Sequence, residues 1–79
     1  MDPHYDLVVD VIATRFGIDR AAVLPECSFD DLDLDSLAQV ELATALQKRL
    51  GQEIDDEEMA QLSRISEVVD MVRAKKAGD

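Results

Sequence analysis

The sequence has a single cysteine, Cys27, which excludes an intramolecular disulfide and a cysteine-rich metal site. One lone thiol fits a reducing, intracellular setting. No apolar run approaches the roughly 18 residues that a membrane-spanning helix needs, and residues 1–4 lack the basic and apolar regions of a secretory leader. We therefore expect a cytoplasmic protein that does not enter a membrane.

The sequence also lacks the residue sets that most enzymes use. It has no Gly-rich phosphate loop and no zinc-ligand spacing, and its only histidine, His4, has no nucleophile or second base beside it. The acids that begin at Asp31 start like a calcium-binding EF-hand loop, but Ser36 and Leu42 stand where that loop needs glycine and glutamate. We predict no catalytic residue and no metal site.

Basic residues are few: eight lysines and arginines stand against 18 acids, and the formal net charge is −10. This charge opposes binding to nucleic acid or anionic lipid and favours partner proteins with basic surfaces. A chain of 79 residues can form one small domain with one core. We expect a monomeric single domain over residues 1–79.

Apolar residues recur at helical spacings of three and four, and no strand-like alternation of useful length is present. Asp2 and Pro3 suit the cap and first position of a helix, and Gly17 suits its end. A second helix, 36–50, ends before Gly51. The predicted core faces of these two helices are Tyr5, Val8, Val9, Ile12 and Phe16 in the first, and Leu42, Ala43, Leu46 and Leu50 in the second.

Two further helices are predicted after residue 51. Asp55 with Glu58 forms the capping-box pattern of a short helix, and Ser63 is the expected cap of the last helix. The residues expected to be buried by these helices are Met59, Leu62, Ile65, Val68, Val69 and Val72. The predicted fold is all-α, a small antiparallel four-helix bundle of three long helices and one short one.

A long connection, 18–35, joins the first two helices. It is neither polar nor low in complexity, and residues 19–23 can form a helical turn before Pro25. Apolar side chains at Val23, Leu24, Phe29, Leu32 and Leu34 are spaced to hold it against the helices. Long loops without secondary structure of their own are usually either functional or disordered. The composition and the spaced apolar side chains of this one predict an ordered loop that brings Ser36 to the surface.

Ser36 is the candidate functional residue. It stands at the predicted start of the second helix, and Gln39 three residues later completes a capping-box pattern. A hydroxyl at the positive end of a helix dipole suits a phosphate ester, because the helix stabilises the added negative charge. An ordinary capping serine is the alternative.

Leu37 and Val40 fall on the side of the second helix away from its predicted core, together with Glu41. Two apolar side chains beside an acid, one turn from Ser36, indicate a docking surface. Packing under a loop or another helix is the alternative, since exposed apolar residues are common.

Ser28-Phe29, Asp31-Leu32, Asp35-Ser36-Leu37 and Val40-Glu41-Leu42, in this order, resemble the acyl carrier protein family. The resemblance covers nearly the whole chain and suggests a free-standing member. It implies a 4′-phosphopantetheine arm on Ser36, attached by a phosphopantetheinyl transferase, and a non-catalytic carrier. The arm holds acyl or polyketide chains as thioesters for ketosynthases, acyltransferases and other acyl-processing enzymes with basic docking surfaces.

The resemblance also implies partner-recognition roles. Asp35 is expected to help position the transferase and its metal, and Leu37, Val40 and Glu41 to form the recognition face. The chain departs from the family at Asp33, where glycine is frequent, and in the lower acidity of residues 36–50, which include Lys48-Arg49. These departures bear on which enzymes the protein serves.

Two other functions stay open at this point. One is a peptidyl carrier protein that holds amino acids for nonribosomal peptide synthesis. The other is a helical protein–protein interaction module in which Ser36 is only a helix cap or a phosphorylation site.

Overall fold

The computed structural model describes residues 3–77 and the side chains of residues 3–75. The described chain is helical and contains no strand, only an isolated bridge between Ser28 and Arg64. The predicted all-α bundle of three long helices and one short one is confirmed. Its helices are α1 (Pro3–Phe16), α2 (Ser36–Leu50), α3 (Asp56–Ala60) and α4 (Ile65–Ala77), and two short 3₁₀ helices, η1 (Arg20–Ala22) and η2 (Asp30–Leu32), lie between α1 and α2.

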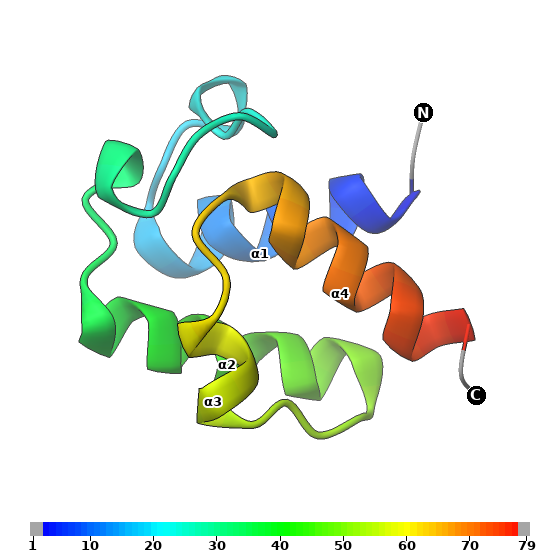
Figure 1. The fold of residues 1–79 in the computed structure, drawn as a ribbon. Helices are drawn as coiled ribbons and strands as arrows, with labels where there is room; N and C mark the ends of the chain where they lie inside the picture. Colours follow the sequence, from blue (N-terminus) through cyan, green and yellow to red (C-terminus); the bar gives the residue numbers. More distant parts are fainter. Residues whose placement is uncertain (1–2, 78–79) are drawn as a thin grey trace.

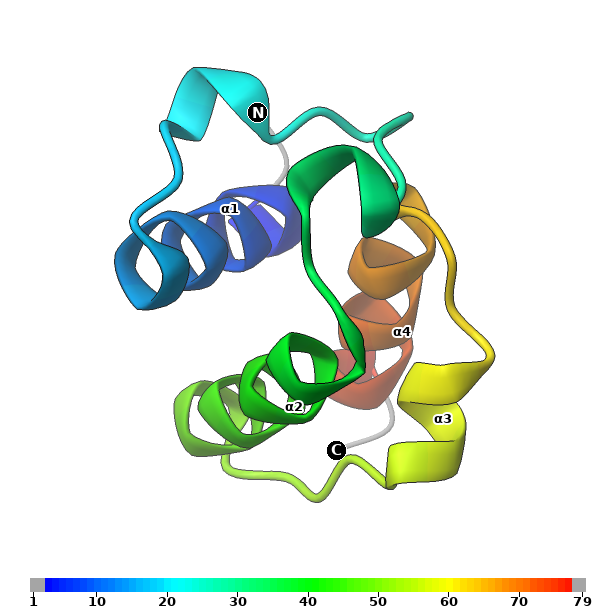
Figure 2. The same cartoon turned by 90° about the vertical axis from the view of Figure 1, so that its left-hand side faces the viewer.

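The long helices α1 and α2 run antiparallel, and α4 packs across α1 (Figure 1). Seen nearly along α1 and α2, the three long helices surround the core, and the short α3 lies beside α2 at the edge of the bundle (Figure 2). No helix in the described part of the chain is long and apolar enough to cross a membrane. The arrangement leaves the beginning of α2 at one end of the molecule, below the 17–35 loop.

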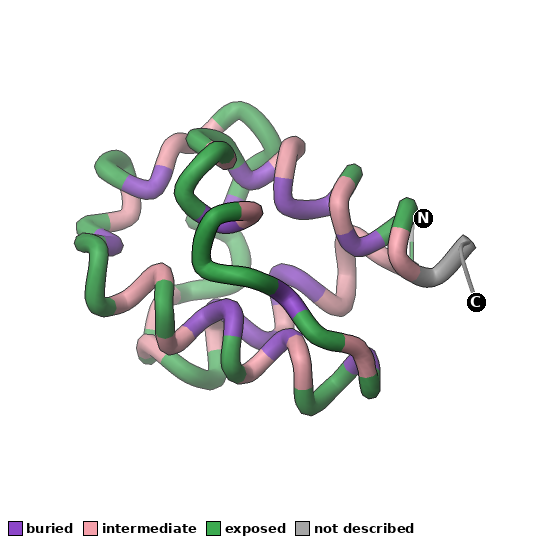
Figure 3. Tube along the Cα trace, turned by 60° about the horizontal axis from the view of Figure 1, so that its bottom comes forward, coloured by how far each residue is buried: buried purple, intermediate pink, exposed green. Residues whose placement is uncertain are grey.

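The predicted core faces are confirmed in α2 and α4, where every predicted position is buried. In α1 the face is shifted: Val11, which we did not predict, is buried, whereas Tyr5 and Phe16 are only half-buried. Buried and exposed stretches alternate along each helix, as the 3.6-residue period requires (Figure 3). Leu62 likewise packs against the core while staying half-buried.

The loop between α1 and α2 is ordered, as predicted, and backbone hydrogen bonds attach it to the start of α4. Phe29 N donates to Ser63 O at 3.1 Å, and Ile65 N donates to Cys27 O at 2.9 Å. The Tyr5 hydroxyl donates to Val23 O at 2.6 Å and joins the loop to α1. These bonds satisfy loop backbone groups that burial would otherwise leave without partners.

One loop prediction is wrong. Val23, Phe29 and Leu34 are buried and Leu32 is half-buried, but Leu24 is 44% exposed. Leu24 directly follows Val23, whose side chain enters the core, so its own side chain is directed away from it. Spacing alone did not distinguish the two neighbours.

The helix ends follow local chemistry with one exception. Gly17 and Gly51 adopt positive φ angles of 66° and 70°, as a helix stop requires. Ser63 was predicted to cap α4, but α4 begins at Ile65, and the carboxylate of Glu67 accepts from the backbone N–H groups of both Ser63 and Arg64 at 2.9 Å. The prediction for Asp2 lies outside the described residues.

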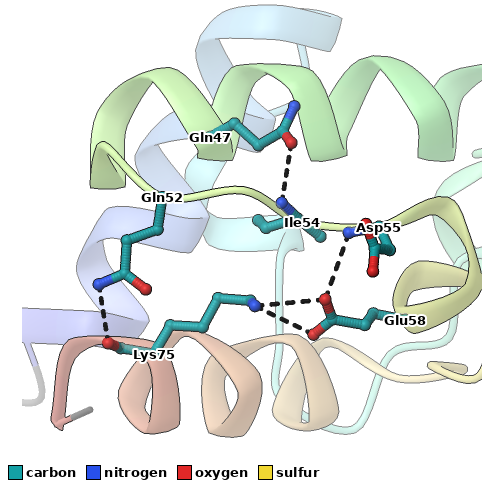
Figure 4. Close-up of polar contacts among 6 residues, drawn as sticks. All are labelled: Gln47, Gln52, Ile54, Asp55, Glu58 and Lys75. Atoms are coloured by element: carbon teal, nitrogen blue, oxygen red, sulfur yellow. Dashed lines mark hydrogen bonds and ion pairs between the residues drawn. The ribbon is translucent and has the colours of Figure 1, made fainter. Parts of the chain in front are cut away.

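Polar contacts hold the 51–60 segment against its neighbours (Figure 4). The predicted capping box at the start of α3 is formed, and Asp55 N donates to Glu58 Oε1 at 3.3 Å. Gln47 Oε1 accepts from Ile54 N at 2.8 Å and ties this segment to α2. Gln52 Nε2 donates to Lys75 O at 2.8 Å and ties it to α4.

Candidate functional site

The loop is shaped so that its last residues enter α2 in a fixed direction. Ser28 and Asp31 form a reciprocal pair across η2: Ser28 N donates to Asp31 Oδ2 at 3.0 Å, and Asp31 N donates to Ser28 Oγ at 3.1 Å. Asp33 then adopts a left-handed conformation with φ of 57°. This turn places Leu34 in the core, with Leu34 N donating to Phe29 O at 2.8 Å.

The residue that caps α2 is Asp35, not Ser36. Its extended backbone and its carboxylate, which accepts from Ala38 N at 2.9 Å, are those of an N-cap residue. The predicted capping box of Ser36 with Gln39 is therefore wrong, and Gln39 Nε2 instead donates to Leu34 O at 3.5 Å. A carboxylate and a hydroxyl are both good caps, so the sequence did not decide between two adjacent candidates.

Because Asp35 caps the helix, the Ser36 hydroxyl is not used for capping. Ser36 is the first residue of α2, is exposed, and makes no side-chain hydrogen bond within the described chain. The backbone N–H groups of Ser36 and Leu37 also have no acceptor there, because Asp35 satisfies only those of Ala38 and Gln39. Two outward-facing amides and the helix dipole suit a phosphate ester on this oxygen.

The predicted recognition residues gather around Ser36. Leu37 is 68% exposed and Val40 is 45% exposed, so both lie off the core face as predicted, and Glu41 is half-buried. Exposed apolar side chains that lie together mark a candidate protein-interaction surface. All four predicted recognition residues therefore lie at one end of α2: Leu37, Val40 and Glu41 in its first two turns, and Asp35 as its cap.

A groove of about 230 Å³ opens beside Ser36, between α2 and α3. Prediction from the sequence missed its far wall, where Asp56 and Ala60 face α2. The small side chain of Ala60, on an exposed position of a short acidic helix, was the available signal. The lining residues are Ser36, Gln39, Val40, Asp56, Met59 and Ala60.

The acids near the serine do not form a metal site. Within residues 3–77, no group of three or more His, Cys, Asp or Glu side chains is placed to hold a metal ion. Asp30, Asp33 and Asp35 instead line a shallow depression with Leu34 and face solvent. Their charges make the approach to Ser36 strongly negative.

A family model described as a phosphopantetheine attachment site matches residues 6–72 of this chain. The acyl carrier protein of Rubrobacter xylanophilus is 42% identical over 66 residues, which cover 82% of this chain and 82% of that protein. The chain belongs to the acyl carrier protein family.

Other comparisons agree with this membership. The carrier is 42% identical over 69 residues to the acyl carrier protein of Thermobifida fusca, covering 86% of this chain and 87% of that one. The crystal structure of the acyl carrier protein from Thermotoga maritima superimposes with a TM-score of 0.83 at 21% identity, covering 96% of this chain and 94% of that chain. At that identity the superposition supports the fold.

Membership defines the cofactor of the carrier, which is covalently attached 4′-phosphopantetheine. Acyl carrier proteins are non-catalytic carriers, and membership in this family implies interaction with acyl-chain-processing enzymes. The exposed hydroxyl and the free amides at the start of α2 fit such a group, whose phosphate needs hydrogen-bond donors.

Proposed function

We propose that this protein carries growing acyl or polyketide chains on a 4′-phosphopantetheine arm attached to Ser36. The observation that supports this most strongly is the exposed Ser36 hydroxyl at the first position of α2, directly after the capping Asp35. We include in the proposal that residues 1–79 act as one carrier domain in the cytoplasm, a reducing compartment that suits the lone Cys27.

Ser36 and its neighbours have different roles in attaching and holding the arm. A phosphopantetheinyl transferase transfers the arm from coenzyme A. Ser36 Oγ forms a bond to the phosphorus that carries pantetheine, the pyrophosphate bond of coenzyme A breaks, adenosine 3′,5′-bisphosphate leaves, and a base of the transferase takes the hydroxyl proton. Asp35 helps to position that transferase and its metal. The two free amides at Ser36 and Leu37 then stabilise the phosphodiester. When bound, the arm supplies a thiol that holds acyl groups as thioesters, whose carbonyl carbon is electrophilic.

The surface beside Ser36 guides the partner enzymes. Leu37 and Val40 supply the apolar contact, while Glu41 and the acids that precede α2 supply negative charge. Ketosynthases, acyltransferases and the transferase would meet this face with basic surfaces, which speeds encounter and sets orientation. A tethered acyl group is then presented to the docked enzyme at high effective concentration.

The test is the intact mass of the protein after incubation with coenzyme A, Mg²⁺ and a transferase of broad specificity. We expect a gain of one phosphopantetheine group in the wild type and in Ser63→Ala, and none in Ser36→Ala. Ser63 is a matched control because it is also exposed and its observed hydrogen bonds use only its backbone.

No gain in a folded wild-type protein would overturn the carrier function and leave Ser36 as part of an interaction module. A gain that persists in Ser36→Ala would place the arm elsewhere. Loading the modified protein with acyl groups or with amino acids, using the matching loading enzymes, then separates an acyl carrier from a peptidyl carrier.

A further inference from the structure

A second groove, of about 310 Å³, lies between α1 and α2 on the flank of α2 that faces α1. Val11, Thr14 and Ala45 line it together with three cations. No carboxylate lines it, in a chain whose net charge is −10. The cations are Arg15, Lys48 and Arg49.

The charge that lines this groove is positive, opposite in sign to the net charge of the chain. Asp10 does not line the groove, but it pairs with Arg49, which does. Arg49 and Arg20 each donate to one carboxylate oxygen of Asp10 at 2.9 Å, and these hydrogen bonds, that of Arg49 foremost, lower the pKa of Asp10. Arg15 and Lys48 are exposed and form no ion pair within the described chain. Of the three cations that line the groove, Arg49 is therefore paired with Asp10, whereas Arg15 and Lys48 keep an uncompensated charge.

The groove is far from the serine. Lys48 lies twelve residues after Ser36, which corresponds to about 18 Å along an α-helix. The groove beside Ser36 opens toward α3, whereas this one opens toward α1. A partner can therefore occupy the α1–α2 groove while the serine end of α2 stays accessible.

We propose that the α1–α2 groove is a second docking site, which binds an acidic amphipathic helix of a partner protein. An apolar side chain of that helix enters between Val11 and Ala45, and flanking carboxylates pair with Arg15 and Lys48. Its polarity is opposite to that of the Ser36 face, so the two sites recognise different kinds of surface.

Charge complementarity favours this occupant over others. The groove is open and its two uncompensated cations extend into solvent, which suits a surface rather than an enclosed small molecule. A second copy of this chain would bring another ten negative charges, and self-repulsion opposes that association. A separate protein that presents one acidic helix brings carboxylates only where the cations lie.

The test uses NMR titration of the full-length ¹⁵N-labelled protein with a synthetic amphipathic helix whose leucine ridge is flanked by glutamates. A second peptide has lysine in place of every glutamate. We expect the glutamate peptide to shift the backbone amides of Val11, Thr14, Arg15, Ala45, Lys48 and Arg49, and the lysine peptide to leave them unchanged.

Three variants make the test specific. Lys48→Glu should weaken binding of the glutamate peptide about tenfold, because an attraction becomes a repulsion. Arg73→Glu changes the net charge equally on α4 and should leave binding unchanged. Asp10→Asn should tighten binding, since it releases Arg20 and Arg49.

The site is overturned if the glutamate peptide leaves these amides unshifted, if Lys48→Glu binds it as tightly as the wild type, or if both peptides bind alike. A concentration-dependent dimer that buries the same residues would also overturn it, in favour of a second copy. None of these measurements requires a modified Ser36, and the glutamate peptide should bind Ser36→Ala equally, so failure here is separate from failure of the carrier function.

Discussion

Lys75 Nζ lies 3.1 Å from Glu58 Oε2, and this ion pair joins the short helix α3 to α4 (Figure 4). Lys75 is largely covered, with 19% of its side chain exposed, whereas 40% of the Glu58 side chain is exposed. Because α3 has only five residues, it gains little from its own hydrogen bonds and depends on such tertiary contacts. The wall of the groove beside Ser36 is therefore held in part by this pair.

Glu58→Gln should destabilise the protein at neutral pH and lose this effect in acid. The hydrogen bonds from Lys75 and from the backbone of Asp55 lower the pKa of Glu58 below its usual 4.5. A carboxylate with a lowered pKa stabilises the fold above the unfolded-state pKa, and this contribution disappears as pH falls through the folded-state pKa.

The measurement is the difference in melting temperature between wild type and Glu58→Gln, followed from pH 7 to well below pH 4.5. The matched control is Glu57→Gln, an exposed neighbour for which the structure shows no side-chain bond within the described chain. A difference that stays constant with pH would contradict the role of the charge.

Asp33 should tolerate glycine and reject valine. Its φ of 57° lies in the left-handed region, where a β-branched side chain costs about 1–2 kcal/mol and glycine costs nothing sterically. Glycine removes the steric strain of the left-handed backbone, but it also gives the unfolded chain more conformational freedom, which offsets part of that gain. The free energy of unfolding of Asp33→Gly should therefore stay within about 1 kcal/mol of the wild type. Urea unfolding of both variants checks this, and equal stabilities would show that the turn is not maintained in solution.

Asp35 should show two separable roles. Asp35→Ala removes the cap and should cost about 0.5–2 kcal/mol of stability, whereas Asp35→Asn keeps a capping oxygen and should cost little. Both remove the negative charge beside Ser36, so both should slow modification by the transferase. If Asp35→Asn is modified as fast as the wild type, then the charge has no part in recognition.

Leu37 and Leu46 are two leucines of α2 whose replacement by alanine should have different effects. One replacement should lower recognition by partner enzymes, and the other should lower stability. Leu46 is fully buried, so Leu46→Ala should destabilise the protein by about 2–5 kcal/mol. Leu37 is 68% exposed, so Leu37→Ala should change stability by less than about 0.5 kcal/mol and instead lower kcat/KM of partner enzymes. Thermal unfolding and turnover of the loaded carrier test the pair, and unchanged turnover would remove Leu37 from the recognition face.

Salt should stabilise the protein. A net charge of −10 on 79 residues produces self-repulsion in the compact state, and added ions screen it. We expect the melting temperature to rise from low to physiological salt and to rise further with divalent cations. A melting temperature that is flat from low to physiological salt would contradict this prediction.

The sequence predicted much of the site because most of its signals are local. The apolar period of residues 36–50 placed Leu42, Leu46 and Leu50 in the core and left Leu37 and Val40 outside, as the structure confirms. The position of Ser36 at the start of a helix followed from the same pattern. The pattern did not show that Asp35, and not Ser36, caps this helix. Capping depends on the backbone angles of Asp35, and these are set by the turn at Asp33 and the burial of Leu34.

By itself, the sequence determined the helices, the glycines that end them and the exposed serine. The apolar repeat of a helix and the glycine that stops it are both local signals, which involve only residues close together in the chain. Only the tertiary structure decided that Ala60 faces Ser36 across a groove, that Leu24 is exposed, and that Arg15 and Lys48 come together. These relationships join residues far apart in the chain, and side-chain packing between helices, not helix propensity, brings them into contact.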